Sequence, residues 1–197
     1  MTRRNFWLVA PYAAWMLLMC ALPSTAWAYA VRGAVTAVLL AVSAVRLGAY
    51  PEAFRLRAVA PALLPGVVAG LVVFAVWIAP EYIFAATGSA KSEASAYSPE
   101  TCGAALTVVK LAASALVIPA AEELFFRRWL VDFAGFWWMV VLFAVEHGDR
   151  WHVGAIAGVV YGLVAKRSGL AAAVVAHSVT NLVLGLYVVF GDKWMYW

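Results

Sequence analysis

The sequence predicts an all-α protein, a polytopic membrane helical bundle that forms a single integral membrane domain over residues 1–197. Two numbers favour this fold class: 66% of the residues are hydrophobic and only 12% are charged. A soluble domain carries roughly 45–50% apolar and about 25% charged residues, so this chain has too little charge to coat a water-facing surface. The composition also excludes nucleic acid as a leading partner, although the net charge is +4.

The third observation is that the apolar residues fall into runs of helical length. A crossing of the membrane needs about 20 mostly apolar residues, and three early runs meet this length, at 5–23, 26–46 and 59–83. The break between the last two contains Pro51, Glu52, Arg55 and Arg57. The first run imitates a secretory signal but exceeds the roughly 7–15 residues of a signal core, so we expect an uncleaved helix.

The second half begins after a polar, small-residue stretch at 87–100, which predicts an extramembrane loop. A fourth crossing is expected at about 104–130, with a kink at Pro119. A last crossing covers 170–190.

Two shorter runs, at 135–148 and 152–165, lie between these crossings. Each has about 14 residues, or roughly 21 Å of helix, which is too short to span comfortably. The turn between them, HGDRW at 147–151, is therefore expected below the membrane surface, where protein or trapped water must satisfy its backbone. In total the sequence predicts about seven transmembrane helices, two of them short and joined by a submerged turn.

The placement of basic residues predicts the orientation. With the N-terminus in the cytoplasm, the inner side carries Arg3, Arg4, Arg46, Arg55, Arg57, Arg127, Arg128, Lys166 and Arg167. The outer side then carries only Lys91, Arg150 and Lys193. The positive-inside rule favours this arrangement, so we expect a cytoplasmic N-terminus.

Ionisable side chains inside a bilayer are costly, and each is therefore a functional hypothesis. Counted from the inner ends of their helices, Glu122, His147 and His177 all fall roughly 12–18 Å from the cytoplasmic boundary. Three separate helices are thus expected to deliver one carboxylate and two imidazoles to a single buried layer. The coincidence in depth favours a hydrolytic site over three unrelated polar contacts.

Residue spacing suggests how these groups divide their roles. Glu123 lies four residues before Arg127, a favourable helical ion-pair spacing, which leaves Glu122 free to act as a general base on water. His177 and Asn181 share one helix face and could donate two hydrogen bonds to an oxyanion. The alternatives are a helix-end ion pair and ordinary interhelical hydrogen bonds.

Other chemistries fit less well. Phe143 and His147 repeat the four-residue spacing, so the ring is expected to shield the site while the imidazole shares the water with Glu122. No HExxH zinc motif occurs, and Ser178 faces away from its neighbour His177, which disfavours a serine nucleophile. Two histidines and a glutamate could bind a metal, but we expect no cofactor and no metal.

Three motifs carry a family resemblance: Glu122-Glu-Leu-Phe-Phe-Arg127, Phe143-Ala-Val-Glu-His147 and His177-Ser-Val-Thr-Asn181. In this order they resemble the EExxxR, FxxxH and HxxxN motifs of the CPBP family of intramembrane proteases, which includes the CAAX prenyl endopeptidases. The resemblance covers roughly the C-terminal half of the chain, from Lys110 onward, and implies a glutamate-dependent endopeptidase whose catalytic helices are residues 104–190. It implies that Glu122 and His147 activate water, that His177 and Asn181 stabilise the oxyanion, and that Glu123 and Arg127 support the site.

Finer features, such as the HGDRW turn and the aromatic C-terminal segment, resemble a bacterial subgroup of CAAX protease-related proteins linked with exosortase systems. This resemblance implies an integral protein of the bacterial inner membrane. Its substrate would be a membrane-associated protein or peptide cut near the C-terminus, and its other partner is the lipid bilayer. The alternatives are a small proton-coupled transporter and a non-catalytic immunity or scaffold membrane protein.

Overall fold

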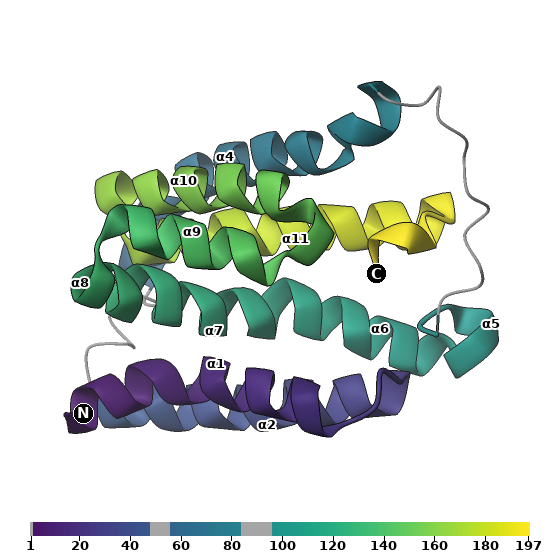
Figure 1. The fold of residues 1–197 in the computed structure, drawn as a ribbon, viewed down its shortest axis with the longest axis horizontal. Helices are drawn as coiled ribbons and strands as arrows, with labels where there is room; N and C mark the ends of the chain where they lie inside the picture. The colour runs from purple at the N-terminus through teal and green to yellow at the C-terminus, as the bar shows by residue number, and fades with distance from the viewer. Residues whose placement is uncertain (1, 48–55, 84–95) are drawn as a thin grey trace.

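The computed structural model describes residues 2–47, 56–83 and 96–197, and within these ranges the chain forms helices and turns without a strand (Figure 1). The elements are α1 (Arg3–Ala21), α2 (Ala26–Leu47), α4 (Leu56–Ile83), α5 (Pro99–Cys102), α6 (Ala104–Ala112), η1 (Ala113–Val117), α7 (Ile118–Glu123), η2 (Leu124–Leu130), α8 (Val131–Ala134), α9 (Phe136–Glu146), η3 (Gly148–Arg150), α10 (Trp151–Ser168), α11 (Leu170–Gly191) and η4 (Trp194–Tyr196). The predicted all-α class is therefore confirmed.

Each apolar run of the sequence is helical in the structure, with shifted ends. The helix α10 extends to Ser168, three residues beyond the expected end, because Lys166 and Arg167 suit the negative end of a helix dipole. Gly169 then ends it with a φ of 86°. Pro51, Glu52, Arg55 and most of the expected polar loop, residues 87–95, lie outside the described residues.

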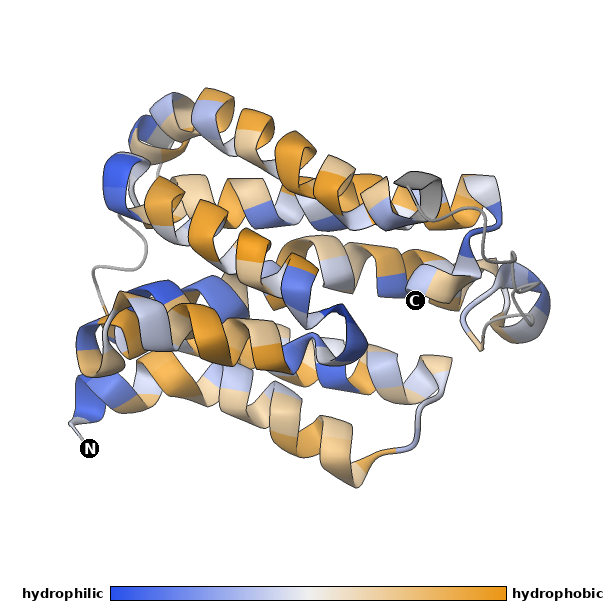
Figure 2. Cartoon of the chain, turned by 45° about the horizontal axis from the view of Figure 1, so that its top comes forward, coloured by the Kyte–Doolittle hydropathy of each residue, from blue (hydrophilic) through white to orange (hydrophobic). Residues whose placement is uncertain are grey.

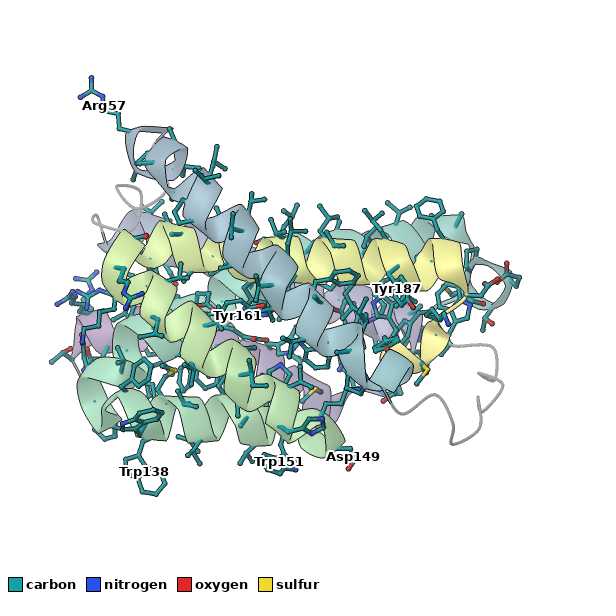
Figure 3. The ribbon with its side chains drawn as sticks, turned by 90° about the horizontal axis from the view of Figure 1, so that it is seen from above. Arg57, Trp138, Asp149, Trp151, Tyr161 and Tyr187 are labelled. Carbon is teal, nitrogen blue, oxygen red and sulfur yellow. The ribbon has the colours of Figure 1, made fainter. Side chains whose placement is uncertain are left out.

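Within residues 2–47, 56–83 and 96–197, four helical segments are long and apolar enough to cross a membrane: Ala26–Leu47, Arg57–Pro80, Ala104–Ala134 and Leu170–Gly191. The helix Phe136–Glu146 is apolar but shorter. Hydrophobic residues make up much of the long helices (Figure 2), and many large hydrophobic side chains are exposed. Among them, Trp138 and Trp151 point away from the bundle with 63% and 60% of their surface exposed (Figure 3). The chain is an integral membrane protein because such faces are stable only against lipid.

The helices are arranged around one long composite helix, α6 to α8, which crosses the middle of the molecule (Figure 1). On one side it packs against the antiparallel pair α1 and α2, and on the other it faces α4, α9, α10 and α11. The main core lies where these groups meet and includes Phe126, Met139, Phe143 and Tyr161. Residues of the middle helix are thus buried on both sides.

The helices α4 and α11 approach each other closely because glycine faces the contact. A methyl group added to Gly70 would lie 2.5 Å from the Ala176 carbonyl oxygen, so no larger residue fits. The Gly70 carbonyl also accepts a hydrogen bond from Thr180 Oγ1 at 2.9 Å. Thr180 in turn accepts the Tyr161 hydroxyl of α10 at 2.7 Å, which joins three helices beside the turn that carries His177.

The hairpin of α9 and α10 is shorter than its neighbours. Gly135, with a φ of 89°, lets the chain reverse from α8 into α9. The helix α9 has 11 residues, or about 16 Å, and its connection η3 ends short of the level reached by α5 and α6 (Figure 1). This geometry is compatible with the expected submerged turn, whose depth in a membrane stays a prediction.

Candidate active site

The two adjacent glutamates lie on a short α-helical stretch between two widened turns of the middle helix. The segments η1 and η2 are π-helical, and α7 between them carries Glu122 and Glu123. The irregularity expected near Pro119 takes this form, because the proline lacks the N–H of a regular turn. Single π-helical turns inside α-helices recur at functional sites, since they re-aim neighbouring side chains.

Glu123 is fully buried and has two partners. Its Oε1 accepts a hydrogen bond from His177 Nδ1 at 2.9 Å, and its Oε2 lies 3.1 Å from Arg127 Nε. The predicted pairing of Glu123 with Arg127 is therefore present in the structure. The histidine contact was not predicted, because sequence spacing says nothing about a residue 54 positions away.

Arg127 is held as a buried ion rather than as a hydrogen-bond donor. Its Nε faces Glu123 Oε2 at ion-pair distance, but the alignment makes no hydrogen bond, and its other nitrogens have no hydrogen-bond partner among the described residues. Its guanidinium lies 4.1 Å from the centre of the Phe143 ring. The negative ring face and the Glu123 carboxylate together compensate the charge.

Glu122 points to the other side of the same imidazole. Its Oε2 lies 3.8 Å from His177 Nε2, and no arginine or lysine in the described part of the chain pairs with it. The distance exceeds that of a direct hydrogen bond. Glu122 is thus the unpaired carboxyl that the sequence indicated, and His177 lies between the two acids.

His147 closes α9, and one nitrogen of its ring is committed to the backbone. Its Nδ1 lies 2.6 Å from the Phe143 carbonyl oxygen, which can only accept, so Nδ1 carries the proton and Nε2 keeps a lone pair. The ring packs between Phe143, at 4.7 Å, and Trp77, at 5.5 Å, measured between ring centres. A methyl group at Gly154 would lie 2.9 Å from the His147 Cβ, so the position of this histidine depends on that glycine.

Asn181 lies one turn after His177 on α11 and is fixed by the middle helix. Its side-chain amide donates to the Ser114 carbonyl of η1 at 2.9 Å. An amide nitrogen has two N–H groups, so one remains for another acceptor. The predicted pairing of His177 and Asn181 on one helix face is therefore compatible with two donors, although both side chains also make fixed contacts.

Phe143 joins the parts of this cluster. Its ring is fully buried, lies 5.9 Å from the ring of His177, and contacts His147 and Arg127 on its other sides. We therefore find six of the seven predicted site residues in one connected cluster: Glu122, Glu123, Arg127, Phe143, His147 and His177. The seventh, Asn181, lies one helical turn after His177 and is bound to Ser114. Their chemical roles stay predictions.

Two other residues hold the site but were not among the seven predicted for it. Tyr161 stacks on the His177 ring at 4.9 Å and an interplanar angle of 22°. Glu146 lies within hydrogen-bonding reach of Tyr12 and close enough to Glu122 for their charges to interact. Glu146 is an ionisable residue inside a crossing and directly precedes His147, and that position was the available signal. An aromatic residue such as Tyr161 gives no such signal in a chain rich in aromatics.

Among the described residues, no group of three or more His, Cys, Asp or Glu side chains is arranged to hold a metal ion. His177 has one nitrogen on Glu123, and His147 has one on the backbone. The expectation that the protein needs no metal remains a prediction.

The described helices form a membrane bundle whose core holds two buried glutamates and two histidines in one cluster. Residues 104–183 match the model of the Rce1-like family of type II CAAX prenyl endopeptidases. The match covers less than half of the chain but includes all three motifs, from Glu122 to Asn181. The resemblance predicted from those motifs is thus confirmed for the catalytic helices. The chain has no significant match among curated proteins or among solved structures.

Proposed function

We propose that this protein is an intramembrane endopeptidase that hydrolyses a peptide bond near the C-terminus of a membrane-associated protein or peptide. The observation that carries the proposal is the buried contact of an unpaired carboxyl, Glu122, with the imidazole of His177, which is itself backed by Glu123. A carboxyl that lacks a permanent counter-ion is available to take and return a proton. The match of residues 104–183 supports endopeptidase chemistry in general.

In the proposed mechanism Glu122 and the Nε2 lone pair of His147 bind one water molecule. Glu122 accepts a proton as the water oxygen attacks the scissile carbonyl carbon, and the carbonyl oxygen becomes an oxyanion. When the tetrahedral intermediate collapses, the C–N bond breaks and Glu122 returns its proton to the leaving amine. The reaction is balanced in protons, because one water molecule is consumed and one carboxylic acid and one amine are formed.

The oxyanion would be stabilised by Asn181 and His177. Asn181 has one N–H held by Ser114, which leaves the second for the oxyanion. His177 Nδ1 donates to Glu123, so a donor at Nε2 requires the doubly protonated imidazolium, which would receive its second proton from Glu122 and return it before the C–N bond breaks. Glu123 stabilises that form, in the way that a buried carboxylate holds the histidine of a hydrolase triad.

The setting of the reaction is part of the proposal. The excess of basic residues at one membrane side favours a cytoplasmic N-terminus. The resemblance to the bacterial subgroup favours the inner membrane and a substrate that carries a C-terminal sorting signal.

The decisive experiment compares the C-termini of envelope proteins in a deletion strain complemented with the wild-type protein or with Glu122→Gln. We expect at least one membrane-associated protein to be shortened at its C-terminus only with the wild type. The Glu122→Gln protein must be present at wild-type abundance, which immunoblotting measures. Identical C-termini in both strains would contradict the proposal and favour a transporter or a non-catalytic immunity or scaffold protein.

A further inference from the structure

Two cations are buried together on the side of the catalytic cluster toward the start of α6. Arg32 of α2 is 4% exposed and Lys110 of α6 is 7% exposed, and the two charges lie close enough to repel each other. In the described ranges neither forms an ion pair with a carboxylate. Arg32 Nε is also buried without a hydrogen-bond partner there. Buried charges that lack a counter-ion are strongly unfavourable, so a bound anion would stabilise this pair.

Aromatic rings form the walls around these cations. Lys110 Nζ lies 4.1 Å from the ring centre of Tyr29, 4.3 Å from Tyr97 and 4.8 Å from Trp197. The Arg32 guanidinium lies 5.3 Å from Trp15 and 5.4 Å from Tyr29. Ring faces attract a cation but carry no net charge. They hold the two side chains in place, and the positive charge remains available to a ligand.

The two cations and their rings, here called the Arg32–Lys110 cluster, are connected to the catalytic residues. Tyr29 interacts with the Ser114 hydroxyl, and the Ser114 carbonyl accepts the amide of Asn181. Lys110 lies four residues before Ser114 and twelve before Glu122 on the same composite helix. At about 1.5 Å per residue these separations are roughly 6 Å and 18 Å.

We infer that the Arg32–Lys110 cluster binds the free C-terminal carboxylate of the peptide substrate, an inference that rests on the proposed function. A carboxylate bridging a guanidinium and an ammonium would supply such an anion and gain charge-assisted hydrogen bonds. The scissile carbonyl lies between Asn181 and Glu122, so the carboxylate is roughly 6–18 Å from it. At about 3.3–3.6 Å per extended residue, the released peptide has about two to five residues.

The test measures binding separately from cleavage. The probe is a mixed library of dye-labelled apolar hexapeptides, made as free acids and as C-terminal amides. Binding is measured by fluorescence anisotropy on the Glu122→Gln protein in a maltoside detergent, which contains no phosphate. Cleavage of the same libraries by the wild-type protein is measured by mass spectrometry. We expect the acids to bind at least about tenfold more tightly than the amides.

Three variants in the Glu122→Gln background locate the effect. Lys110→Met and Arg32→Met should each abolish the preference for the acid, while Lys166→Met, which removes an exposed charge, should keep it. The melting temperature of the Lys110→Met protein should be unchanged or raised, because an uncompensated buried charge is removed. A purely structural lysine would lower the melting temperature when replaced and leave the preference intact, which would overturn the inference.

The outcomes separate the two proposals. Equal binding and equal cleavage of acids and amides would overturn the carboxylate site and leave the proposed endopeptidase standing. Preference for acids that depends on Lys110, without any cleavage by the wild type, would support the site and contradict the endopeptidase. Phosphatidylglycerol is added as a competitor. If it binds in a Lys110-dependent way while the peptide acids do not, the cluster recognises a lipid phosphate and the inference is wrong.

Discussion

Removing either member of the buried pair of Glu123 and Arg127 should strongly destabilise the protein, because the other charge stays buried without its counter-ion. Glu123→Gln leaves the Arg127 guanidinium buried among aromatic rings, of which Phe143 is 4.1 Å away, without its carboxylate. Breaking a buried ion pair in this way costs about 3–5 kcal/mol. For a chain of this length that corresponds to a fall of about 6–20 °C in the melting temperature. The Glu123→Gln/Arg127→Gln double variant should lose less than the sum of the two single variants.

The same composite helix provides a matched control. Arg128 and Asp132 have the same four-residue spacing, with Nη1 and Oδ2 2.7 Å apart, but their side chains are 40% and 66% exposed. Exposed pairs of this kind contribute about 0.3–0.5 kcal/mol, so Asp132→Asn should shift the melting temperature by about 2 °C or less.

The assay is thermal unfolding in detergent, followed by tryptophan fluorescence at a fixed heating rate for every variant. Glu122→Gln belongs in the same series, because its carboxyl has no permanent counter-ion. We expect its stability to be normal or improved while turnover is abolished. If Glu122→Gln proves destabilising and Glu123→Gln inert, the roles of the two glutamates are reversed and the reasoning is refuted.

Three further predictions concern the reaction itself. Glu122→Ala and His147→Ala should remove nearly all proteolysis. Asn181→Ala should lower the rate of cleavage about 10²–10³-fold, as for loss of one oxyanion donor. Folded variants that cleave at wild-type rates would contradict these roles. The purified protein should contain less than one zinc per chain and keep its activity in a chelator. Activity lost on metal removal and regained on addition would instead make Glu122, His147 and His177 metal ligands. Gly154→Ala should lower kcat up to about 10²-fold by displacing His147, because its methyl group would lie 2.9 Å from that side chain. Gly158→Ala, whose nearest contact would be 3.3 Å, should have a smaller effect, and equal kcat values for the two variants would contradict the explanation.

The fold class was predictable because a bilayer permits few solutions. Apolar runs of sufficient length must be helices there, since no water satisfies an exposed backbone. Ends of helices were less predictable. The helix α10 extends past its apolar run to Gly169, because charged residues at a helix end can continue the helix into water. Pro119 is a local signal for the π-helical turn before Glu122, whereas the one after Glu123 depends on packing on both sides of the middle helix and has no such signal.

The residues of the candidate site were predictable from depth, but their contacts were not. Counting residues from helix ends placed Glu122, His147 and His177 in one layer. The rotation of each helix about its axis determines which carboxylate oxygen contacts which imidazole nitrogen. Close contacts such as those of Gly70 and Gly154 set this rotation. The hydrogen bond from His177 to Glu123 and the stacking of Tyr161 therefore became visible only in the structure.

The glycine contact between α4 and α11 has a consequence for how the protein tolerates change. At Gly70 one main chain lies directly against the other, so the spacing of the two helices is determined by covalent geometry rather than by side-chain rotamers. The Thr180 hydroxyl, which donates to the carbonyls of Gly70 and Ala176, provides a second contact between the two helices at the same level. The turn that carries His177 is therefore insulated from substitutions on the lipid-facing surface. A change in membrane thickness or acyl-chain order should therefore shift the outer helices before it shifts the His177 imidazole.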